Sequence, residues 1–178
     1  MKNNIVLIGF MGVGKGSISR TLSKMLDMLV LDTDDVIVSM EKREIKTIFK
    51  KEGEGYFRDL ENKVCRWMAA NIDHTIIATG GGFPIYVDDV KALGRVIYLK
   101  NSFKGIMDRI ESSHNPKKKL KKRPLFKDQK KAKALLESRL EKYAAAADIT
   151  IDVEGKTVAE VIAEITEALK PATVGTDA

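Results

Sequence analysis

The segment from Gly9 to Ser17 contains the residues whose types and spacing point most directly to chemistry. Its glycines and lysine follow the pattern G-x-x-x-x-G-K, typical of a phosphate-binding loop. In such a loop the backbone N–H groups turn toward a polyphosphate, and the following helix adds a favourable dipole. A glycine-rich turn with an incidental lysine is the alternative, but the flanking strand-like and helical patterns disfavour it. The residues expected to bind nucleotide phosphates are Gly12, Val13, Gly14, Lys15, Gly16 and Ser17.

One position in this segment departs from the motif. The lysine is usually followed by serine or threonine, whose hydroxyl is a Mg²⁺ ligand, but here it is followed by Gly16. Ser17 lies one residue further, about 100° around a helix, and cannot take over that position. Because Mg²⁺ readily keeps several waters in proteins, we expect a metal without a direct ligand from the loop.

Three aspartates follow a second strand-like run, in the order Leu31-Asp32-Thr33-Asp34-Asp35. The carboxyl ends of parallel strands meet at one edge of a sheet, so Asp32 and Asp34 are expected to face the same crevice as the phosphate loop. A plainer interpretation is that Asp34 or Asp35 only caps the next helix. The sequence around them leaves both interpretations open.

Three further groups of residues could bind an anionic or hydroxylated ligand. Arg58 and Glu61 are three residues apart and share a helix face, as an ordinary surface ion pair also would. The triplet Gly80-Gly81-Gly82 indicates either close approach of the backbone to a ligand or a flexible loop. Arg139 and Tyr143 share a helix face at a spacing of four.

The apolar pattern predicts the elements that position these residues. Short apolar runs typical of buried parallel strands alternate with helical periodicities, for example from Phe57 to Met68 and from Val158 to Leu169. The alternation predicts one three-layer α/β/α domain over 1–170, with a parallel sheet covered on both faces and a frayed tail at 171–178. Strands are expected at 5–8, 29–31, 75–78, 95–99 and 149–151.

Composition narrows the class of protein. The chain has 178 residues, 44% of them hydrophobic and 31% charged, a balance typical of globular domains. No window approaches the 18 consecutive apolar residues of a membrane span. A single cysteine, Cys65, excludes an internal disulfide and favours a reducing compartment. We therefore expect a cytoplasmic protein, with Cys65 and Trp67 in or near the core.

The net charge of +6 is concentrated in one segment. Ten basic residues between Ser112 and Lys133 stand against one acid, Asp128, so this segment carries +9 and the remainder −3. Nucleic-acid binders usually spread basic charge over a whole docking face, so nucleic-acid binding through this segment is the least favoured function. The surplus lysines are expected to form a solvated face that attracts nucleotide from a distance.

Taken in order along the chain, these motifs resemble the shikimate kinases from Ile5 to about Leu169. The resemblance includes the phosphate loop, the Asp32-Thr33-Asp34 step, Phe57-Arg58 with Glu61, the glycine triplet, Arg123-Pro124-Leu125 and the Arg139–Tyr143 pair. It implies a P-loop kinase with a five-stranded parallel sheet, a lid at about 112–128 and a small helical substrate-binding region at about 33–61. The implied reaction is transfer of the γ-phosphoryl group of ATP, with Mg²⁺, to the 3-hydroxyl of shikimate in aromatic amino-acid biosynthesis.

The resemblance also implies roles at the acceptor end of the site. Asp34 would hydrogen-bond the ring hydroxyls and accept the reacting proton, while Arg58 and Arg139 would bind the carboxylate with guanidinium forks. Glu61 would orient Arg58. The backbone of Gly80, Gly81 and Gly82 would line the acceptor, with Phe49 and Phe57 as candidate walls.

At the donor end, the resemblance implies that Lys15 and the lid residue Arg123 supply positive charge to the transferring phosphoryl group. Asp32 would hold Mg²⁺ through water, and Gly16 stands at the family's metal-ligand position without a side chain. Arg109 and Lys156 would contact adenine, although Thr157 replaces the proline expected next to Lys156.

Two features leave other functions open. Phe83-Pro84 stands where small residues are expected and could reshape the acceptor pocket. The acceptor could then be another small hydroxy acid or a nucleoside monophosphate. With Gly16 in place of a metal ligand, a nucleotide-binding module with impaired metal coordination is the non-enzymatic alternative. We expect a monomer that binds neither nucleic acid nor membranes.

Overall fold

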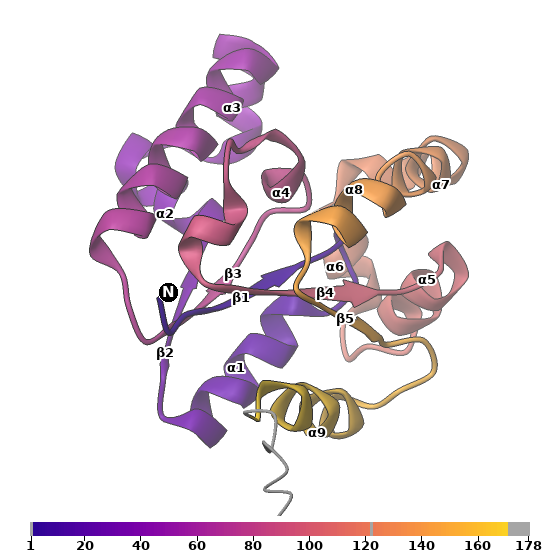
Figure 1. Ribbon diagram of the computed structural model, residues 1–178. Helices are drawn as coiled ribbons and strands as arrows, with labels where there is room; N and C mark the ends of the chain where they lie inside the picture. The colour runs from indigo at the N-terminus through magenta and orange to yellow at the C-terminus, as the bar shows by residue number, and fades with distance from the viewer. Residues whose placement is uncertain (1, 122, 171–178) are drawn as a thin grey trace, which may run out of the picture.

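A computed structural model describes residues 2–121 and 123–170. The expected tail at 171–178 and Lys122 of the expected lid lie outside the described residues. The centre of the molecule is a five-stranded parallel sheet in the order β2-β3-β1-β4-β5 (Figure 1). The strands are β1 (Ile5–Ile8), β2 (Leu29–Asp32), β3 (Thr75–Ala78), β4 (Arg95–Lys100) and β5 (Ile149–Asp152).

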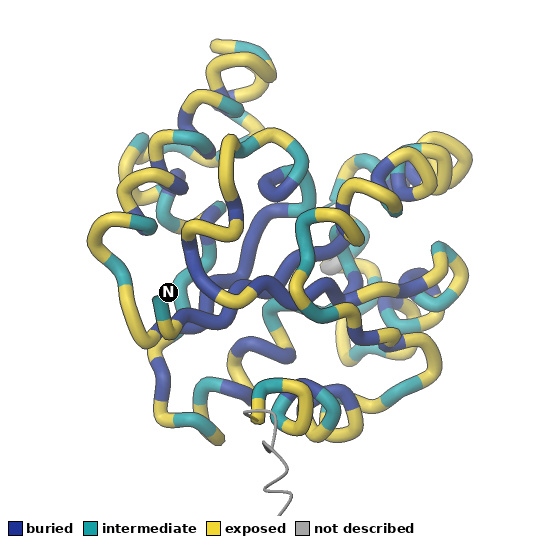
Figure 2. Tube along the Cα trace, in the orientation of Figure 1, coloured by how far each residue is buried: buried dark blue, intermediate teal, exposed yellow. Residues whose placement is uncertain are grey.

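The sheet confirms the five strands expected from the sequence, with β2, β4 and β5 each one residue longer. Residues of β1 and β3 are buried throughout, as a central parallel strand covered on both faces requires. Figure 2 shows the buried residues concentrated along the sheet and on the helix faces turned toward it. The uninterrupted apolar runs of β1 and β3 thus reflect two-sided burial, whereas the edge strands β2 and β5 are mostly half-buried or exposed.

Helices cover both faces of the sheet. α1 (Lys15–Leu26) and α9 (Val158–Leu169) lie on one face, while α3 (Ile45–Asn71) and α8 (Leu140–Ala146) lie on the other (Figure 1). α9 begins with the expected capping box between Thr157 and Glu160. The remaining helices are α2 (Thr33–Glu41), α4 (Phe83–Tyr86), α5 (Phe103–Glu111), α6 (Pro116–Lys121) and α7 (Gln129–Glu137), with short 3₁₀ turns η1 (Val90–Leu93) and η2 (Pro124–Lys127).

α3 is broken by a glycine. Gly53 has φ 84° and ψ 178°, a left-handed backbone conformation that glycine adopts without steric cost. The break starts a new helical segment at Glu54, so that Glu54, Arg58 and Glu61 follow one another on one helix face.

Two residues of α3, Cys65 and Trp67, were expected to lie in or near the core. Cys65 is buried, and its thiol donates to the carbonyl oxygen of Asp89 at 3.5 Å. The expectation for Trp67 is wrong, because its side chain is 52% exposed. It follows Cys65 by two residues, which places it about 200° around the helix and away from the core.

Candidate active site

The phosphate loop joins β1 to α1 at the centre of the sheet. Gly9, Gly12 and Gly14 all have positive φ, at 139°, 85° and 115°, so three of its glycines are required by the backbone itself. Gly14 is the N-cap of α1 and makes no side-chain capping hydrogen bond. The start of α1 thus presents backbone N–H groups to an anion, as the motif predicts.

Lys15 is held at this loop by two backbone oxygens. Its Nζ donates to the carbonyl oxygens of Gly9 at 2.6 Å and of Phe10 at 3.1 Å. Burial lowers the pKa of Lys15 to about 8, although Asp34 and Asp32 act in the opposite direction. The ammonium group therefore sits in a poorly solvated place where it can act strongly on a phosphate.

Gly16 follows Lys15 in the first turn of α1. A Cβ atom there would meet Nη1 of Arg20 at 3.4 Å, an ordinary van der Waals contact. Across the part of the chain that the structure describes, no three histidine, cysteine or carboxylate side chains gather to hold a metal ion by themselves. Asp32 and Asp34 do line the same cleft as Lys15, and carboxylate oxygens suit Mg²⁺ that keeps waters and phosphate oxygens as its other ligands.

Asp32 at the end of β2 and Asp34 at the start of α2 have different contacts. Oδ1 of Asp32 accepts from the backbone N–H of Asp34 at 2.9 Å and so caps α2. The interpretation of Asp34 or Asp35 as that helix cap is wrong. Asp34 instead turns toward the glycine triplet, because a Cβ on Gly80 would lie 2.6 Å from its Oδ1. Only glycine leaves room for this carboxylate.

Asp34 is also electrostatically unusual. Burial raises its pKa to about 7, with further raising by the carboxylates of Asp32 and Glu61 and lowering by Lys15. A carboxyl group with a pKa near neutrality can accept a proton and release it again. The backbone next to it is fixed by Thr33, whose Oγ1 accepts from the N–H of Gly80 at 2.9 Å.

Arg58 lies on α3 and is held by two carboxylates. Its Nη1 donates to Oε2 of buried Glu61 at 2.7 Å, which confirms the expected pair. Its Nε and Nη2 donate to Oε1 of Glu54 at 3.1 and 2.7 Å. Burial acts to lower the pKa of Arg58, but these hydrogen bonds outweigh it and the pKa is raised. A Cβ on Gly82 would lie 2.6 Å from Nη1, so the guanidinium group faces the glycine triplet.

The expected Arg139–Tyr143 pair reaches the same triplet from the other side. Tyr143 Oη donates to the carbonyl oxygen of Gly81 at 2.6 Å, and Nη1 of Arg139 donates to it at 3.3 Å. Arg139 precedes α8 as its N-cap, and both residues are buried. A Cβ on Gly81 would also meet the backbone nitrogen of Met11 at 3.2 Å, so the triplet packs directly on the phosphate loop.

Two of the residues expected for the lid and the adenine site, Arg123 and Arg109, also line the cleft, whereas Lys156 does not. Arg123 lines the cleft with Lys15, and burial lowers its pKa. Arg109 also lines it, and its Nη2 donates to the carbonyl oxygen of Lys156 at 2.7 Å. Nζ of Lys156 pairs with Glu164 at 2.6 Å, so this side chain is engaged by α9. Phe49 lines the cleft, whereas Phe57 is buried beside it with ring centroids 4.6 Å apart.

A cleft of about 910 Å³ at the carboxyl ends of the strands is lined by the phosphate loop together with Asp32, Asp34, Gly80, Gly81, Arg109 and Arg123. Arg58 and Arg139 are not among its lining residues and lie beside it, against Gly82 and Gly81. Three residues at this site were missed from the sequence: Glu54, Thr33 and Tyr86, whose ring centroid lies 3.9 Å from the guanidinium carbon of Arg58. Glu54 stands four residues before Arg58 and could have been found from that spacing. Thr33 and Tyr86 carry no local signal, because their contacts are to residues far away in the chain. Phe83 is fully buried and lines no part of the cleft.

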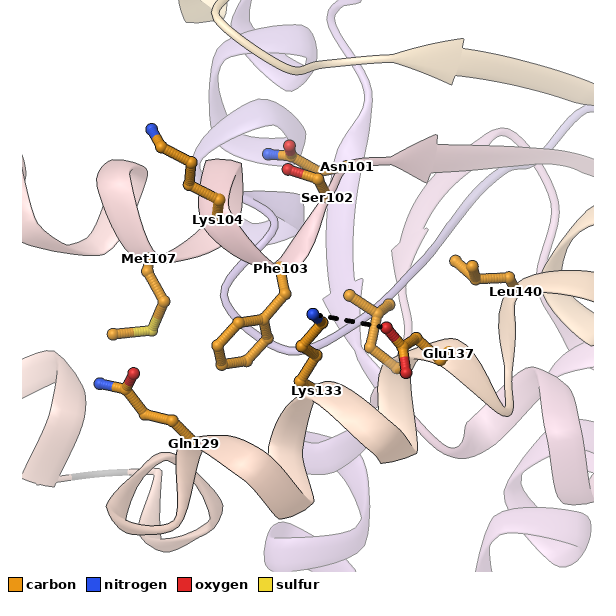
Figure 3. A pocket seen from close by; sticks show the side chains of 10 residues that line it. Asn101, Ser102, Phe103, Lys104, Met107, Gln129, Lys133, Glu137 and Leu140 are labelled. Carbon is orange, nitrogen blue, oxygen red and sulfur yellow. Dashed lines mark ion pairs between the residues drawn. The ribbon is translucent and has the colours of Figure 1, made fainter.

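A second pocket of about 530 Å³ lies beside α5 and α7 (Figure 3). Its walls include the apolar side chains of Phe103, Met107 and Leu140, and Lys133 pairs with Glu137 at 3.8 Å on its rim. It contains none of the phosphate-loop residues and none of the carboxylates discussed above. The larger cleft is therefore the candidate active site.

Within residues 2–121 and 123–170, none of the helices combines the length and apolar character needed to span a membrane.

Comparison with known proteins gives a consistent result. The family model described as shikimate kinase matches residues 11–170. The chain is 38% identical over 166 residues to the shikimate kinase of Helicobacter hepaticus, covering 93% of this chain and 95% of that protein. It is 40% identical over 174 residues to the shikimate kinase of Dehalococcoides mccartyi, covering 95% of this chain and 94% of that protein.

Solved structures agree with the sequence matches. The shikimate kinase of Acinetobacter baumannii, in complex with shikimate, superposes with a TM-score of 0.75 at 26% identity, covering 94% of this chain and 93% of that one. The shikimate kinase of Aquifex aeolicus gives a TM-score of 0.69 at 29% identity, covering 93% of this chain and 95% of that one. The similarity therefore spans the sheet, the phosphate loop and the glycine triplet alike.

Proposed function

The chain belongs to the shikimate kinase family, and we propose that its cleft transfers the γ-phosphoryl group of ATP to the 3-hydroxyl of shikimate, giving shikimate 3-phosphate and ADP. One observation carries the proposal. The glycine triplet brings together the carboxylate of Asp34, the guanidinium groups of Arg58 and Arg139, and the backbone of the phosphate loop. A proton acceptor, two carboxylate-binding groups and a phosphate site thus meet at one place.

At the acceptor end, shikimate offers a carboxylate and three ring hydroxyls. Arg58 and Arg139 would bind the carboxylate, because guanidinium groups match its geometry and charge. Asp34 would accept a hydrogen bond from the 3-hydroxyl and take its proton as the oxygen attacks the γ-phosphorus. Backbone groups of Gly80, Gly81 and Gly82 would line the ring. Glu61, itself buried, keeps Arg58 in place.

At the donor end, the phosphate loop would hold the nucleotide phosphates through the backbone N–H groups of 12–17. As the bond to the acceptor oxygen forms and the bond to the β-phosphate oxygen breaks, Lys15 and Arg123 would stabilise the charge on the transferring group. Arg109 would contact adenine. We also propose Lys156 there, which would require its side chain to leave Glu164.

We propose Mg²⁺ as the metal that accompanies ATP. When bound, it neutralises charge on the β- and γ-phosphate oxygens. Asp32 would hold it through water, and the chain supplies no side chain at Gly16 for direct coordination.

The proposed enzyme is a single kinase domain over 1–170, with a lid at about 112–128 and a substrate-binding region at about 33–61. Closure of the lid would bring Arg123 over the phosphates and exclude water. We propose that it works as a monomer, because one chain supplies every group named above, and in the cytoplasm, where its co-substrate ATP is present.

A coupled assay of ADP release tests the proposal. The purified protein is given MgATP alone, then with shikimate, AMP, CMP or gluconate, and the Lys15→Ala variant serves as the inactive control. We expect release that depends on shikimate and saturates with it. Turnover with a different acceptor would overturn the substrate assignment, and ATP binding without turnover for any acceptor would overturn the enzymatic function.

A further inference from the structure

α4 is a short helix that lies between α3 and α8 (Figure 1). Its residues, Phe83-Pro84-Ile85-Tyr86, directly follow the glycine triplet. Phe83 is buried and anchors the start of the turn, while Tyr86 at its end is 41% exposed. Asn62 of α3 fixes the end of the turn, because its Nδ2 donates to the carbonyl oxygen of Tyr86 at 3.1 Å and its Oδ1 accepts from the N–H of Asp88 at 3.0 Å.

The ring of Tyr86 lies against both arginines of the acceptor site. The guanidinium carbon of Arg58 is 3.9 Å from the ring centroid, and that of Arg139 is 5.9 Å from it. Phe57 and Phe49 are also near Arg58, but at 5.4 and 6.0 Å. Tyr86 is therefore the aromatic ring in closest contact with Arg58, and it also lies within cation–π distance of Arg139.

The other contacts of Arg58 act in different directions. Glu54 binds its Nε–Nη2 edge and Glu61 binds Nη1, so both carboxylates hold the group at its edges. Hydrogen bonds at its edges still let the planar guanidinium group tilt out of its own plane. A ring stacked on its face removes this tilt and leaves the side toward Gly82 directed at the acceptor.

We propose that Tyr86 is a positioning residue for acceptor binding: its ring stacks on Arg58, borders Arg139, and holds the two guanidinium groups ready for the acceptor's carboxylate. Groups held in the binding geometry in advance need not be ordered when the ligand arrives, which strengthens binding. Tyr86 contacts no reacting atom in this role, so it affects affinity for the acceptor and leaves the phosphoryl-transfer step alone.

The inference rests on the proposed function, and the experiment separates the two. Steady-state kinetics are measured for Tyr86→Leu, Tyr86→Phe and Arg58→Ala, each with shikimate and with its methyl ester, which lacks the negative charge. We expect Tyr86→Leu to raise the KM for shikimate about 5- to 20-fold, the range that one cation–π contact supports. We expect kcat to change less than about twofold, the KM for ATP to stay constant, and Tyr86→Phe to behave as the parent protein does.

The methyl ester provides the discriminating measurement. If Tyr86 acts through the arginines, its replacement should raise the KM for the ester by less than about twofold, since the ester gains little from an oriented guanidinium pair. Trp67→Leu removes a different exposed aromatic side chain, which lies on α3, and should change neither KM. Calorimetric titration of shikimate into each variant gives the same comparison as a binding constant, independent of turnover.

Three outcomes would overturn the inference: an unchanged KM for shikimate in Tyr86→Leu, an equal rise in the KM for ATP, or an equal loss with the ester. If Arg58→Ala leaves the KM for shikimate intact, the proposed carboxylate site itself fails. If Arg58→Ala raises that KM and Tyr86→Leu does not, only the role of Tyr86 fails.

Discussion

The two ends of the cleft are built in different ways. At the donor end, one continuous segment of nine residues supplies the phosphate site, and its geometry comes from three glycines with positive φ. At the acceptor end, side chains from α2, α3 and the start of α8 converge on the triplet Gly80–Gly82. A continuous loop can be recognised from its own residues, whereas a convergent site depends on the whole fold that brings its parts together.

The cations at the two ends also differ in their surroundings. Lys15 at the donor end bonds to backbone oxygens, and burial lowers its pKa to about 8. Arg58 at the acceptor end bonds to two carboxylates, and its pKa is raised. The donor cation is thus available to neutralise phosphate charge, while the acceptor cation is balanced and mainly oriented. Loss of the donor cation should therefore reduce catalysis, and loss of the acceptor cation should reduce affinity.

Lys15→Ala should give the largest effect. We expect kcat to fall by about 10³-fold, because a preorganised charge at the transferring group is lost from a water-poor site. Binding of shikimate measured by calorimetry should change little, since the acceptor contacts are elsewhere. Lys24→Ala, an exposed lysine in the last turn of α1, is the matched control. A comparable loss of shikimate affinity in Lys15→Ala would contradict the separation of the two ends.

Asp34→Asn should reduce kcat by about 10²-fold and weaken shikimate binding, because it removes a proton acceptor that also contacts the ring. The pH dependence identifies the group. With the pKa of Asp34 raised to about 7, kcat/KM should rise through pH 7 as the carboxylate forms, and it should fall above about pH 8 as Lys15 loses its proton. The limb near pH 7 should be absent in Asp34→Asn, and its persistence would exclude Asp34 as the acceptor of the proton.

The same pKa shift predicts a change in stability. Because the pKa of Asp34 is raised above its ordinary value near 3.8, its contribution to folding is complete below about pH 4 and is lost as the pH rises through 7. Asp34→Asn keeps a neutral side chain at every pH. Its Tm should therefore exceed that of the parent protein at pH 8, with little difference at pH 4. Equal melting curves at both pH values would refute the shift.

Arg58→Ala should act mainly on affinity. We expect the KM for shikimate to rise about 30-fold, within the range of a charge-assisted hydrogen bond to a carboxylate, with kcat reduced less than fivefold. Arg66→Ala, about two turns beyond Arg58 on the same helix and paired with Asp88 at the surface, provides the control. A variant that loses kcat while keeping its KM would reverse the comparison between the two ends.

The sequence predicted the sheet and the position of the phosphate loop. The central strands β1 and β3 could be recognised because two-sided burial leaves uninterrupted apolar runs, and the phosphate loop because its φ angles demand glycine. The glycine triplet was interpreted as an approach of backbone to a ligand. In the structure, the absence of side chains in the triplet leaves room for Asp34 and Arg58. The sequence pattern alone cannot distinguish this close packing from the close approach of a ligand.

The parts that were not predicted have different physical causes. Asp32 caps α2 and frees Asp34, a division of roles that requires the actual turn geometry. Tyr86 stacks on Arg58, which is 28 positions earlier in the chain. Trp67 lies on the exposed face of a long helix, although helical spacing and aromatic character both indicated a place in or near the core. For Tyr86 the spatial neighbour decides, and local spacing carries no information about it.

Gly16→Ser should have the smallest effect and tests the departure from the phosphate-loop motif. A serine side chain fits, because its Cβ would meet Arg20 Nη1 at an ordinary 3.4 Å. If the metal has no direct ligand from the loop, the added hydroxyl should tighten MgADP binding about threefold in calorimetry, while ADP without metal binds equally to both proteins. Gly55→Ser, on α3 where a Cβ meets nothing within 4 Å, is the control for a new hydroxyl. Equal MgADP affinity in Gly16→Ser and in the parent protein would contradict a metal that lacks a direct ligand from the loop.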